Sequence, residues 1–227
     1  MSNEREGDRY FYGEAKKKRE IPDDVAVVLD FLPHGNPFDK HVEHRRVPLA
    51  QVVGYKYFTL FELVVPEGEN FEVGEKIYAG PEYVGKGPIK SIFGPISYED
   101  LTTVAKENLV SVLSQIIKEN EKYFLKFFNN AGSITLRMHM LELLPGIGKR
   151  TLNVMLDERK RKPFESFEDI VQRLTIRGVK IHNIEKVIAE RIVKELIGGE
   201  RYYLFIRPSP NESQAVYLRI LDEIYRE

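Results

Sequence analysis

Short apolar or alternating runs dominate the chain from Val25 to Ser97. They are rich in Val, Ile, Tyr and Phe, are separated by Gly, Pro and Asn, and read VAVVLDFL, VPLAQVVG, YKYFTLFELVV, FEVGEKIYAG and IKSIFGPI. Such runs are typical of β-strands, and none is long enough for an amphipathic helix. About five strands in about 75 residues match the size of an oligonucleotide-binding (OB) barrel. We therefore predict a small OB-like β-barrel at residues 23–97.

A helical period replaces the strand pattern beyond Ser97. Apolar residues then recur three and four positions apart, at Leu101, Val104, Ala105, Leu109, Val112, Leu113, Ile116, Phe124 and Phe127. This spacing predicts a connecting helix at 98–130, with Ser97 and Asp100 as a capping box and a break near Asn120. Residues 131–200 read as several short helices joined by tight turns, and thus as a helical domain.

The pattern changes again at residues 201–227. The run YYLFIR, between Gly199 and Pro208, is too short for a buried helix and too apolar for water, so it predicts a buried strand. Its expected partners are the edge of the β domain or the long helix at 101–128. The segment QAVYLRILDEIY then has helical spacing. We expect this C-terminal strand and helix to fold back onto the body of the protein.

Residues 1–22 are rich in charge and lack an apolar period. They include the basic cluster Lys16, Lys17, Lys18 and Arg19. A segment of this kind cannot bury enough apolar surface to fold alone. We interpret it as a flexible charged arm. The favoured interpretation is a solvated terminus without a specific role.

The most informative segment is the turn Leu144-Pro-Gly-Ile-Gly-Lys-Arg150, which an amphipathic helix is expected to precede and a second helix to follow. Gly146 and Gly148 permit positive φ angles and leave room for close approach to the main chain. The turn is therefore expected to present free backbone N–H groups at the positive end of a helix dipole, beside Lys149 and Arg150. Such a turn binds phosphate groups without reading bases.

This segment resembles the helix-hairpin-helix motif, in which an apolar residue precedes Pro-Gly-Ile/Val-Gly. Residues 163–170, PFESFEDI, resemble the connector of tandem helix-hairpin-helix domains. The position of a second hairpin holds Leu174-Thr-Ile-Arg-Gly178, with one Gly and no Pro-Gly-x-Gly. We expect this second hairpin to complete the packing rather than to bind phosphate equally. The predicted fold class is α+β, a small OB-like β-barrel plus an all-α tandem helix-hairpin-helix domain at 131–200.

Charge is distributed unevenly although the formal net charge is only −1. Residues 131–200 carry 13 basic and 10 acidic side chains, against 17 and 21 in residues 1–130. The run Arg159-Lys160-Arg161-Lys162 adds to the basic footprint that nucleic acid requires. The chain has no Cys, which excludes disulfides and thiolate chemistry and favours a reducing, cytoplasmic setting. It also lacks an apolar run long enough to span a membrane.

The wider chain resembles an archaeal family catalogued as domain of unknown function 655. The resemblance covers about residues 23–208 and rests on the β domain and four segments: FFNNA at 127–131, LELLPGIGKR at 141–150, PFESFEDI at 163–170 and YYLFIRP at 202–208. It implies a nucleic-acid-binding protein, more often labelled RNA-binding. It provides no catalytic residues to transfer.

Two enzyme interpretations fail on particular residues. The turn is similar to that of helix-hairpin-helix DNA glycosylases, but Arg150 occupies the position of their Schiff-base Lys, and arginine stays protonated. Lys149 is one residue too early, a rotation of about 100° on a helix. Residues 80–86 match the start of a phosphate-binding loop, but Gly87 replaces the Ser or Thr that would hold Mg²⁺. We therefore predict no catalytic residues and no cofactor.

Two further groups of side chains leave alternatives open. Tyr55 and Tyr57 alternate along a predicted strand, and they either stack bases or pack against the following helix. A Pro- and Gly-rich segment also contains His34, Asp39, His41, Glu43 and His44. The spacing of His41 and His44 is workable for a metal, but the favoured interpretation is a polar loop without one.

The sequence therefore predicts a non-catalytic nucleic-acid-binding protein, with RNA favoured over DNA, no membrane association and no known protein partner. The expected contacts are Gly146, Ile147, Gly148, Lys149, Arg150, Arg159, Lys160, Arg161, Lys162, Tyr55 and Tyr57. The preference for RNA rests on the family resemblance and on the predicted barrel. The alternative is a protein-interaction scaffold in which the hairpin is purely structural.

Overall fold

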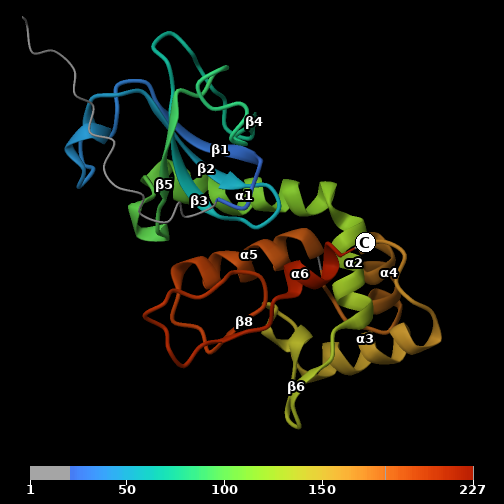
Figure 1. The fold of residues 1–227 in the computed structure, drawn as a ribbon. Helices are drawn as coiled ribbons and strands as arrows, with labels where there is room; N and C mark the ends of the chain where they lie inside the picture. The colour runs from blue at the N-terminus through green and yellow to red at the C-terminus, as the bar shows by residue number, and fades with distance from the viewer. Residues whose placement is uncertain (1–20, 182, 227) are drawn as a thin grey trace, which may run out of the picture.

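The computed structural model describes residues 21–181 and 183–226, and it places a β-rich half above a helical half (Figure 1). Most of the predicted charged arm, residues 1–20, lies outside the described residues. The long helix α1, Thr103–Glu119, runs along the sheet on one side and along helix α5, Ile184–Ile197, on the other. The two halves therefore share one hydrophobic core.

Five antiparallel strands form the β-rich half, in the order β4-β1-β2-β3-β5. They are β1 Val25–Leu32, β2 Leu49–Gly54, β3 Leu60–Val64, β4 Lys76–Tyr78 and β5 Ser91–Pro95. Strands β4 and β5 are the two edges, so the sheet is not closed into the predicted barrel. Closure would require β4 to pair with β5, whereas β4 pairs with β1 and β5 pairs with β3, at opposite ends of the strand order.

Both faces of the sheet centre are covered. Every residue of β2 and β3 is buried, which explains why these strands read as nearly continuous apolar runs. One face packs on α1 through side chains such as Val27, Val53 and Leu60. The other face is covered by loop residues, among them Phe71 and Ile89.

The run YKYFTLFELVV is a strand only from Leu60 onward. Residues 55–57 form a turn between β2 and β3, and Phe58 adopts a left-handed conformation with φ +57°. Its ring is fully buried, next to Phe124. The predicted alternation of Tyr55 and Tyr57 along a strand is therefore wrong, because burial of Phe58 fixes the chain in a turn.

Two helices occupy most of the predicted segment 98–130. The capping box of Ser97 and Asp100 is present, but it begins a short 3-10 helix, η2 Tyr98–Asp100, and Thr102 caps α1 by accepting a hydrogen bond from the Ala105 N–H. Helix α2, Glu121–Asn130, follows. The two helices meet at Asn120, near the predicted break, where the Asn120 amide donates to the Ile116 carbonyl.

The remaining helices are short, as the spacing indicates. They are α3 Lys149–Arg161, α4 Phe167–Ile176, α5, and the C-terminal α6 Ile220–Ile224. Helix α6 is shorter than the helix predicted at 214–225, because Val216–Tyr217 form strand β9. This strand pairs in parallel with β8, Tyr202–Tyr203.

The predicted strand over the run YYLFIR is wrong beyond Tyr202–Tyr203, because residues 204–206 form bends. The segment after β8 is buried, but it does not pair with the five-stranded sheet. The ring of Phe205 lies edge-on to Phe124 and Phe127 of α2, at centroid distances of 6.0 and 5.6 Å. Of the two expected partners, the segment therefore packs against the helix and not against the edge of the sheet. The backbone explains this choice, because the N–H groups of residues 204–206 are satisfied without a neighbouring strand.

Those N–H groups donate to the carboxylate of Glu195. Leu204 donates to Oε1 at 2.7 Å, and Phe205 and Ile206 donate to Oε2 at 2.8 Å each. Arg191, one turn earlier on α5, donates its Nε to the same carboxylate at 2.7 Å. Both side chains are almost fully buried. Burial raises the pKa of Glu195, while Arg191 and the three N–H groups oppose that rise.

We expect Glu195→Gln to lower the free energy of unfolding by about 3–5 kcal/mol, because the buried Arg191 keeps only Glu200 as a charged partner and the three N–H groups lose a charged acceptor. Chemical denaturation of the wild type and the variant measures this difference. Glu190→Gln on the same helix is the control, since the Glu190 side chain is 41% exposed and lies 4.0 Å from Lys186. Equal stability of the Glu195 and Glu190 variants would show that the carboxylate does not hold the C-terminal segment.

Candidate nucleic-acid interface

A β-hairpin and a 3-10 helix precede the turn at 144–148. The hairpin consists of β6 Ser133–Thr135 and β7 Met138–His139, and η3 Met140–Leu143 follows it. The amphipathic helix predicted before the turn is therefore wrong. His139 caps η3, because its Nδ1 accepts from the Leu141 N–H at 3.1 Å while its own N–H donates to Glu142 at 2.9 Å. This reciprocal cap fixes the chain as extended up to His139.

The two glycines of the turn have different conformations. Gly146 has φ +79°, as predicted, whereas Gly148 has φ −89° and ψ −180°, an extended conformation open to any residue. Gly146 therefore uses the positive φ that glycine permits, and Gly148 does not. A Cβ at either glycine would meet nothing within 4 Å, so the main chain is open to solvent. Leu144 and Ile147 are buried and anchor the turn in the core.

The N-terminus of α3 carries free donors. Gly148 is its N-cap and provides no side-chain hydrogen bond. Within the described part of the chain, the backbone N–H groups of Gly148, Lys149 and Arg150 have no protein acceptor. These groups point out of the positive end of a helix dipole, which is the geometry that binds an anion.

The second turn of the helical half is different. Its N-cap Asn183 accepts a hydrogen bond from the Lys186 N–H at 3.0 Å, so the first turn of α5 is capped by the protein itself. Gly178 in this turn has φ +72°, and its carbonyl lies 3.5 Å from the guanidinium of Arg150. The two turns are thus neighbours, but only the first leaves its helix N-terminus uncapped by a side chain.

Three basic residues surround the first turn. Lys149 is 67% exposed, and its Nζ contacts Glu142 at 2.7 Å and the Arg137 carbonyl at 2.7 Å. Arg150 is exposed beside it. The contact with Lys149 brings the tip of the β6–β7 hairpin, with exposed Arg137, next to the turn. Sequence reasoning missed Arg137 because a helix was expected there, and only the His139 cap signals the hairpin.

The basic run at 159–162 lies at the other end of α3, about 16 Å from the turn at 1.5 Å per residue. Arg159 donates to the carbonyls of Phe128 and Ala131, at 2.9 and 3.0 Å, so its guanidinium is used inside the protein. Arg161 contacts Glu158 at 3.1 Å, and Lys162 contacts Glu165 at 2.9 Å. This run is not continuous with the turn, and Arg159 joins helices rather than facing a ligand.

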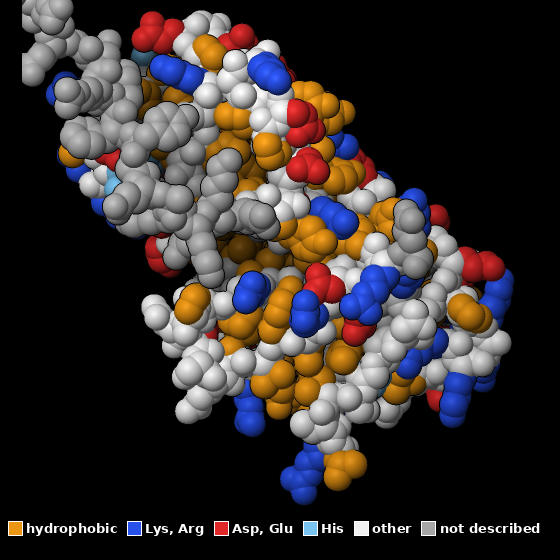
Figure 2. All heavy atoms as spheres, in the orientation of Figure 1, with side chains coloured by type: hydrophobic (Ala, Val, Ile, Leu, Met, Phe, Trp, Pro, Cys, Tyr) orange, Lys and Arg blue, Asp and Glu red, His pale blue; other side chains and the backbone are white. Residues whose placement is uncertain are grey.

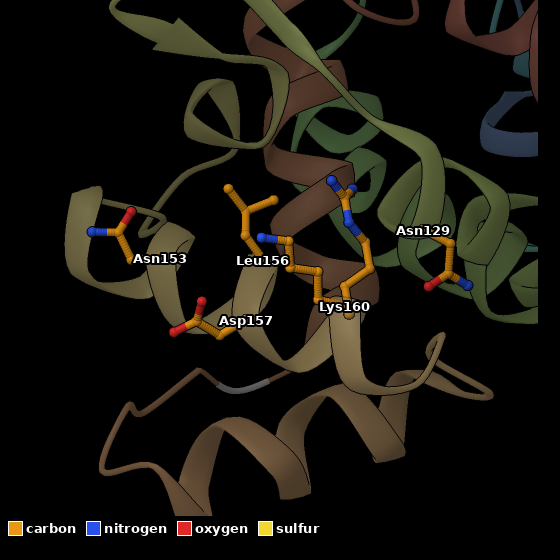
Figure 3. A pocket seen from close by; sticks show the side chains of 6 residues that line it. Asn129, Asn153, Leu156, Asp157 and Lys160 are labelled. Atoms are coloured by element: carbon orange, nitrogen blue, oxygen red, sulfur yellow. The ribbon is translucent and has the colours of Figure 1, made fainter.

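An open cleft of about 740 Å³ lies along α3 (Figure 3). Its lining residues are Asn129, Asn153, Leu156, Asp157, Arg159 and Lys160. Lys160 is the only residue of the basic run besides Arg159 that reaches this cleft. The amide groups and the lysine give the cleft a polar lining that extends from the middle of α3 toward the end of α2.

Tyr55 and Tyr57 pack against helices. The Tyr55 hydroxyl donates to Glu119 of α1 at 2.7 Å, and the Lys76 ammonium lies 4.6 Å from its ring. Tyr57 lies edge-on to Tyr225 at 6.4 Å. Of the two alternatives for these side chains, the structure favours packing over base stacking.

Exposed charge in the helical half is mixed with apolar and polar side chains on the face shown in Figure 2. The β6–β7 hairpin projects from this half at the bottom of the view. The candidate interface is therefore a local one, built on the turn and the hairpin beside it.

No helix among the described residues is both long and apolar enough to cross a membrane.

The family model described as a protein of unknown function, DUF655, matches residues 22–207 of the chain. The chain belongs to this family. One relative is the uncharacterized protein MJ0038 of Methanocaldococcus jannaschii, which is 38% identical over 197 residues, 85% of this chain and 83% of the relative. The crystal structure of Af1531 from Archaeoglobus fulgidus, also of this family, matches with a TM-score of 0.71 and 46% identity. The match covers 82% of this chain and all of Af1531.

Stability is expected to depend on the protonation of His139. Burial, and secondly the charge of Arg159, lower the pKa of His139 below the value of about 6.5 in an unfolded chain. The unfolded state therefore takes up the proton first, and stability falls as the pH drops below about 6.5. Denaturation between about pH 7.5 and pH 5 measures this slope. His139→Asn keeps a capping oxygen and should flatten the slope, and an unchanged slope would exclude His139 as its source.

Proposed function

We propose that the protein is a non-catalytic nucleic-acid-binding protein that holds a phosphate backbone at the turn 145–150. The observation that carries this proposal is the uncapped N-terminus of α3, where three backbone N–H groups face solvent behind two glycines without Cβ atoms. Lys149, Arg150 and Arg137 surround these donors. Donors and positive charge together match a phosphodiester.

The arrangement supports a tandem helix-hairpin-helix type of organisation. Two glycine turns precede α3 and α5, and Arg150 connects them. The first helix of the motif is reduced to η3, and the second turn caps itself through Asn183. In this proposal the first turn binds phosphate, and the second turn positions the first turn. RNA is favoured over DNA on the family resemblance, because phosphate contacts do not distinguish the sugars.

The proposed interface is smaller than the one expected from sequence. It consists of Gly146, Ile147, Gly148, Lys149, Arg150 and Arg137, with Lys160 extending it along the cleft. Arg159, Tyr55 and Tyr57 are left out, because their polar groups and rings contact other parts of the protein. The sheet is left out too, since both faces of its central strands are covered.

The first test uses Gly148→Asp. An Asp side chain at this extended N-cap position would accept hydrogen bonds from the free N–H groups and complement the helix dipole, stabilising the protein by a few tenths of a kcal/mol through the cap and by about 0.3–1 kcal/mol through the dipole. The same carboxylate would occupy the phosphate position and repel the ligand. We therefore expect the melting temperature to rise while affinity for labelled single-stranded RNA falls at least tenfold.

Gly87→Asp is the matched control, since a Cβ there meets no atom closer than 4.0 Å and the loop lies between β4 and β5. It adds the same charge in the β-rich half and should leave affinity unchanged. If Gly148→Asp stabilises the protein without weakening binding, the helix N-terminus is not the site. If the wild-type chain binds neither RNA nor DNA, the hairpin is structural and the scaffold alternative holds.

The second test reverses charge beside the turn. Lys149→Glu combined with Arg150→Glu should weaken binding and reduce the slope of log affinity against log salt by about 1 to 2, since each phosphate contact on a single strand contributes about 0.7. The control, Lys86→Glu with Lys90→Glu, changes net charge equally in the β4–β5 loop. Equal losses in both double variants would indicate a diffuse charge effect and would exclude a site at the turn.

A further inference from the structure

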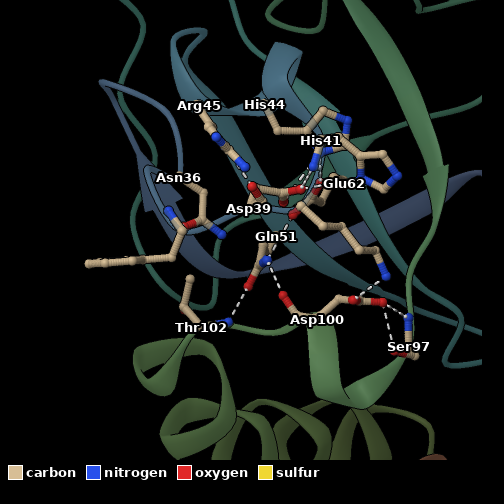
Figure 4. A network of polar contacts seen from close by, with 12 residues as sticks. Asn36, Asp39, His41, His44, Arg45, Gln51, Glu62, Ser97, Asp100 and Thr102 are labelled. Carbon is tan, nitrogen blue, oxygen red and sulfur yellow. Dashed lines mark hydrogen bonds and ion pairs between the residues drawn. The ribbon is translucent and has the colours of Figure 1, made fainter.

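A second cluster of polar side chains lies in the β-rich half, away from the turn. The connection between β1 and β2 contains the 3-10 helix η1, Val42–Arg45, and folds against β3. There Asp39, His41 and His44 each present one ligand-type atom, and these atoms lie within 4.8 Å of one another. Figure 4 shows these side chains converging with Glu62 of β3.

The distances in this cluster suit one small cation. Asp39 Oδ1 lies 3.2 Å from His41 Nδ1, and Asp39 Oδ2 lies 3.3 Å from His44 Nδ1. Ligand atoms at 2.0–2.1 Å from a tetrahedral zinc ion are about 3.3 Å apart. Both imidazoles therefore already face the Asp39 carboxylate, each at a different oxygen, at separations close to those around one zinc ion.

Glu62 adds an independent observation. Its side chain is 1% exposed in the middle of the sheet, and its Oε2 lies 2.8 Å from His44 Nδ1. That oxygen is buried and has no hydrogen-bond partner among the described residues. His44 Nδ1 thus faces two buried carboxylates, although one ring nitrogen donates at most one proton. An unpaired buried oxygen beside a second carboxylate is costly unless a cation lies between them.

Neighbouring residues fix the orientation of these groups. Gln51, buried on β2, donates to Glu62 Oε1 at 2.8 Å and accepts from the Thr102 N–H at 2.8 Å, so Oε2 is directed at His44. The His44 ring stacks on Phe93 of β5, with centroids 3.7 Å apart and planes 19° apart. Metal sites are typically supported by such outer contacts, which set the direction of each ligand.

We propose that Asp39, His41 and His44 bind a divalent transition metal, with zinc as the ion that best suits two imidazoles and one carboxylate. Three protein ligands leave a fourth position open. All three come from the connection between β1 and β2, and Glu62 of β3 places a buried carboxylate beside His44. The metal therefore orders this connection against the centre of the sheet.

The test is a zinc titration of full-length protein that has been stripped with a chelator, using a chromophoric chelator as competitor. We expect one zinc ion per chain and a rise in melting temperature on loading. Cobalt as a probe should give the intense visible absorption of a four-coordinate site. His41→Ala is the first variant, because its side chain is 52% exposed and its loss spares the core; affinity should fall at least tenfold.

His34→Ala is the matched control, since His34 is exposed in the same connection but lies outside the ligand set. Its zinc affinity should equal that of the wild type. Glu62→Gln keeps the shape and removes the charge, so it should weaken zinc binding as His41→Ala does. The proposal is overturned if the stripped wild type takes up no stoichiometric zinc, or if His41→Ala and His34→Ala bind zinc equally. Wild-type affinity in Glu62→Gln overturns the contribution of Glu62 to the site.

Discussion

The ion pair of Arg191 and Glu195 is the interaction on which the helical half depends. The carboxylate receives three consecutive backbone N–H groups from the C-terminal segment, and the guanidinium contacts the Tyr202 carbonyl, Glu200 and the Leu143 carbonyl. Leu143 is the last residue of η3, directly before the turn. One buried pair on α5 therefore links the C-terminal segment to the support of the turn at 144–148.

Such a pair stabilises a fold only when its remaining hydrogen-bonding capacity is used. Here the donors and acceptors around it come from three separate segments, so the pair specifies their relative placement as well as their stability. The two turns differ in the same respect, namely in whether the protein itself uses the hydrogen-bonding capacity of a helix N-terminus. Asn183 caps the start of α5 with its own side chain, whereas the start of α3 has no side-chain cap. The uncapped helix N-terminus therefore lowers stability at the position where binding is proposed.

Apolar runs are sufficient to predict the strands at 25–32, 49–54 and 60–64, because the second and third are buried throughout and the first is buried over residues 26–29. Closure of the sheet was not predictable, since it depends on which strands the edges β4 and β5 pair with. The apolar spacing before the turn fits a helix, so the sequence predicts a helix there. The hairpin that forms instead is fixed by the His139 cap and by the contact of Lys149 with the Arg137 carbonyl, and the spacing shows neither of them.

The candidate sites also combine features that the sequence shows with features that only the fold brings together. Gly146 and its basic neighbours follow from a local motif, but the role of Arg159 inside the protein depends on carbonyls about 30 residues away, which no local pattern encodes. The histidine spacing near His41 was visible in the sequence. Glu62 and Gln51, which turn that spacing into a converging cluster, lie on strands that the fold brings to it.

The position of Phe205 has a consequence for how the protein is made. Its ring completes the core formed by Phe124 and Phe127 of α2, and α1 joins that core to the sheet. During synthesis the early strands leave the ribosome long before this side chain does. The helical core cannot close until Phe205 has emerged, so the strands at 25–95 are made well before the helical half can reach its final packing against them.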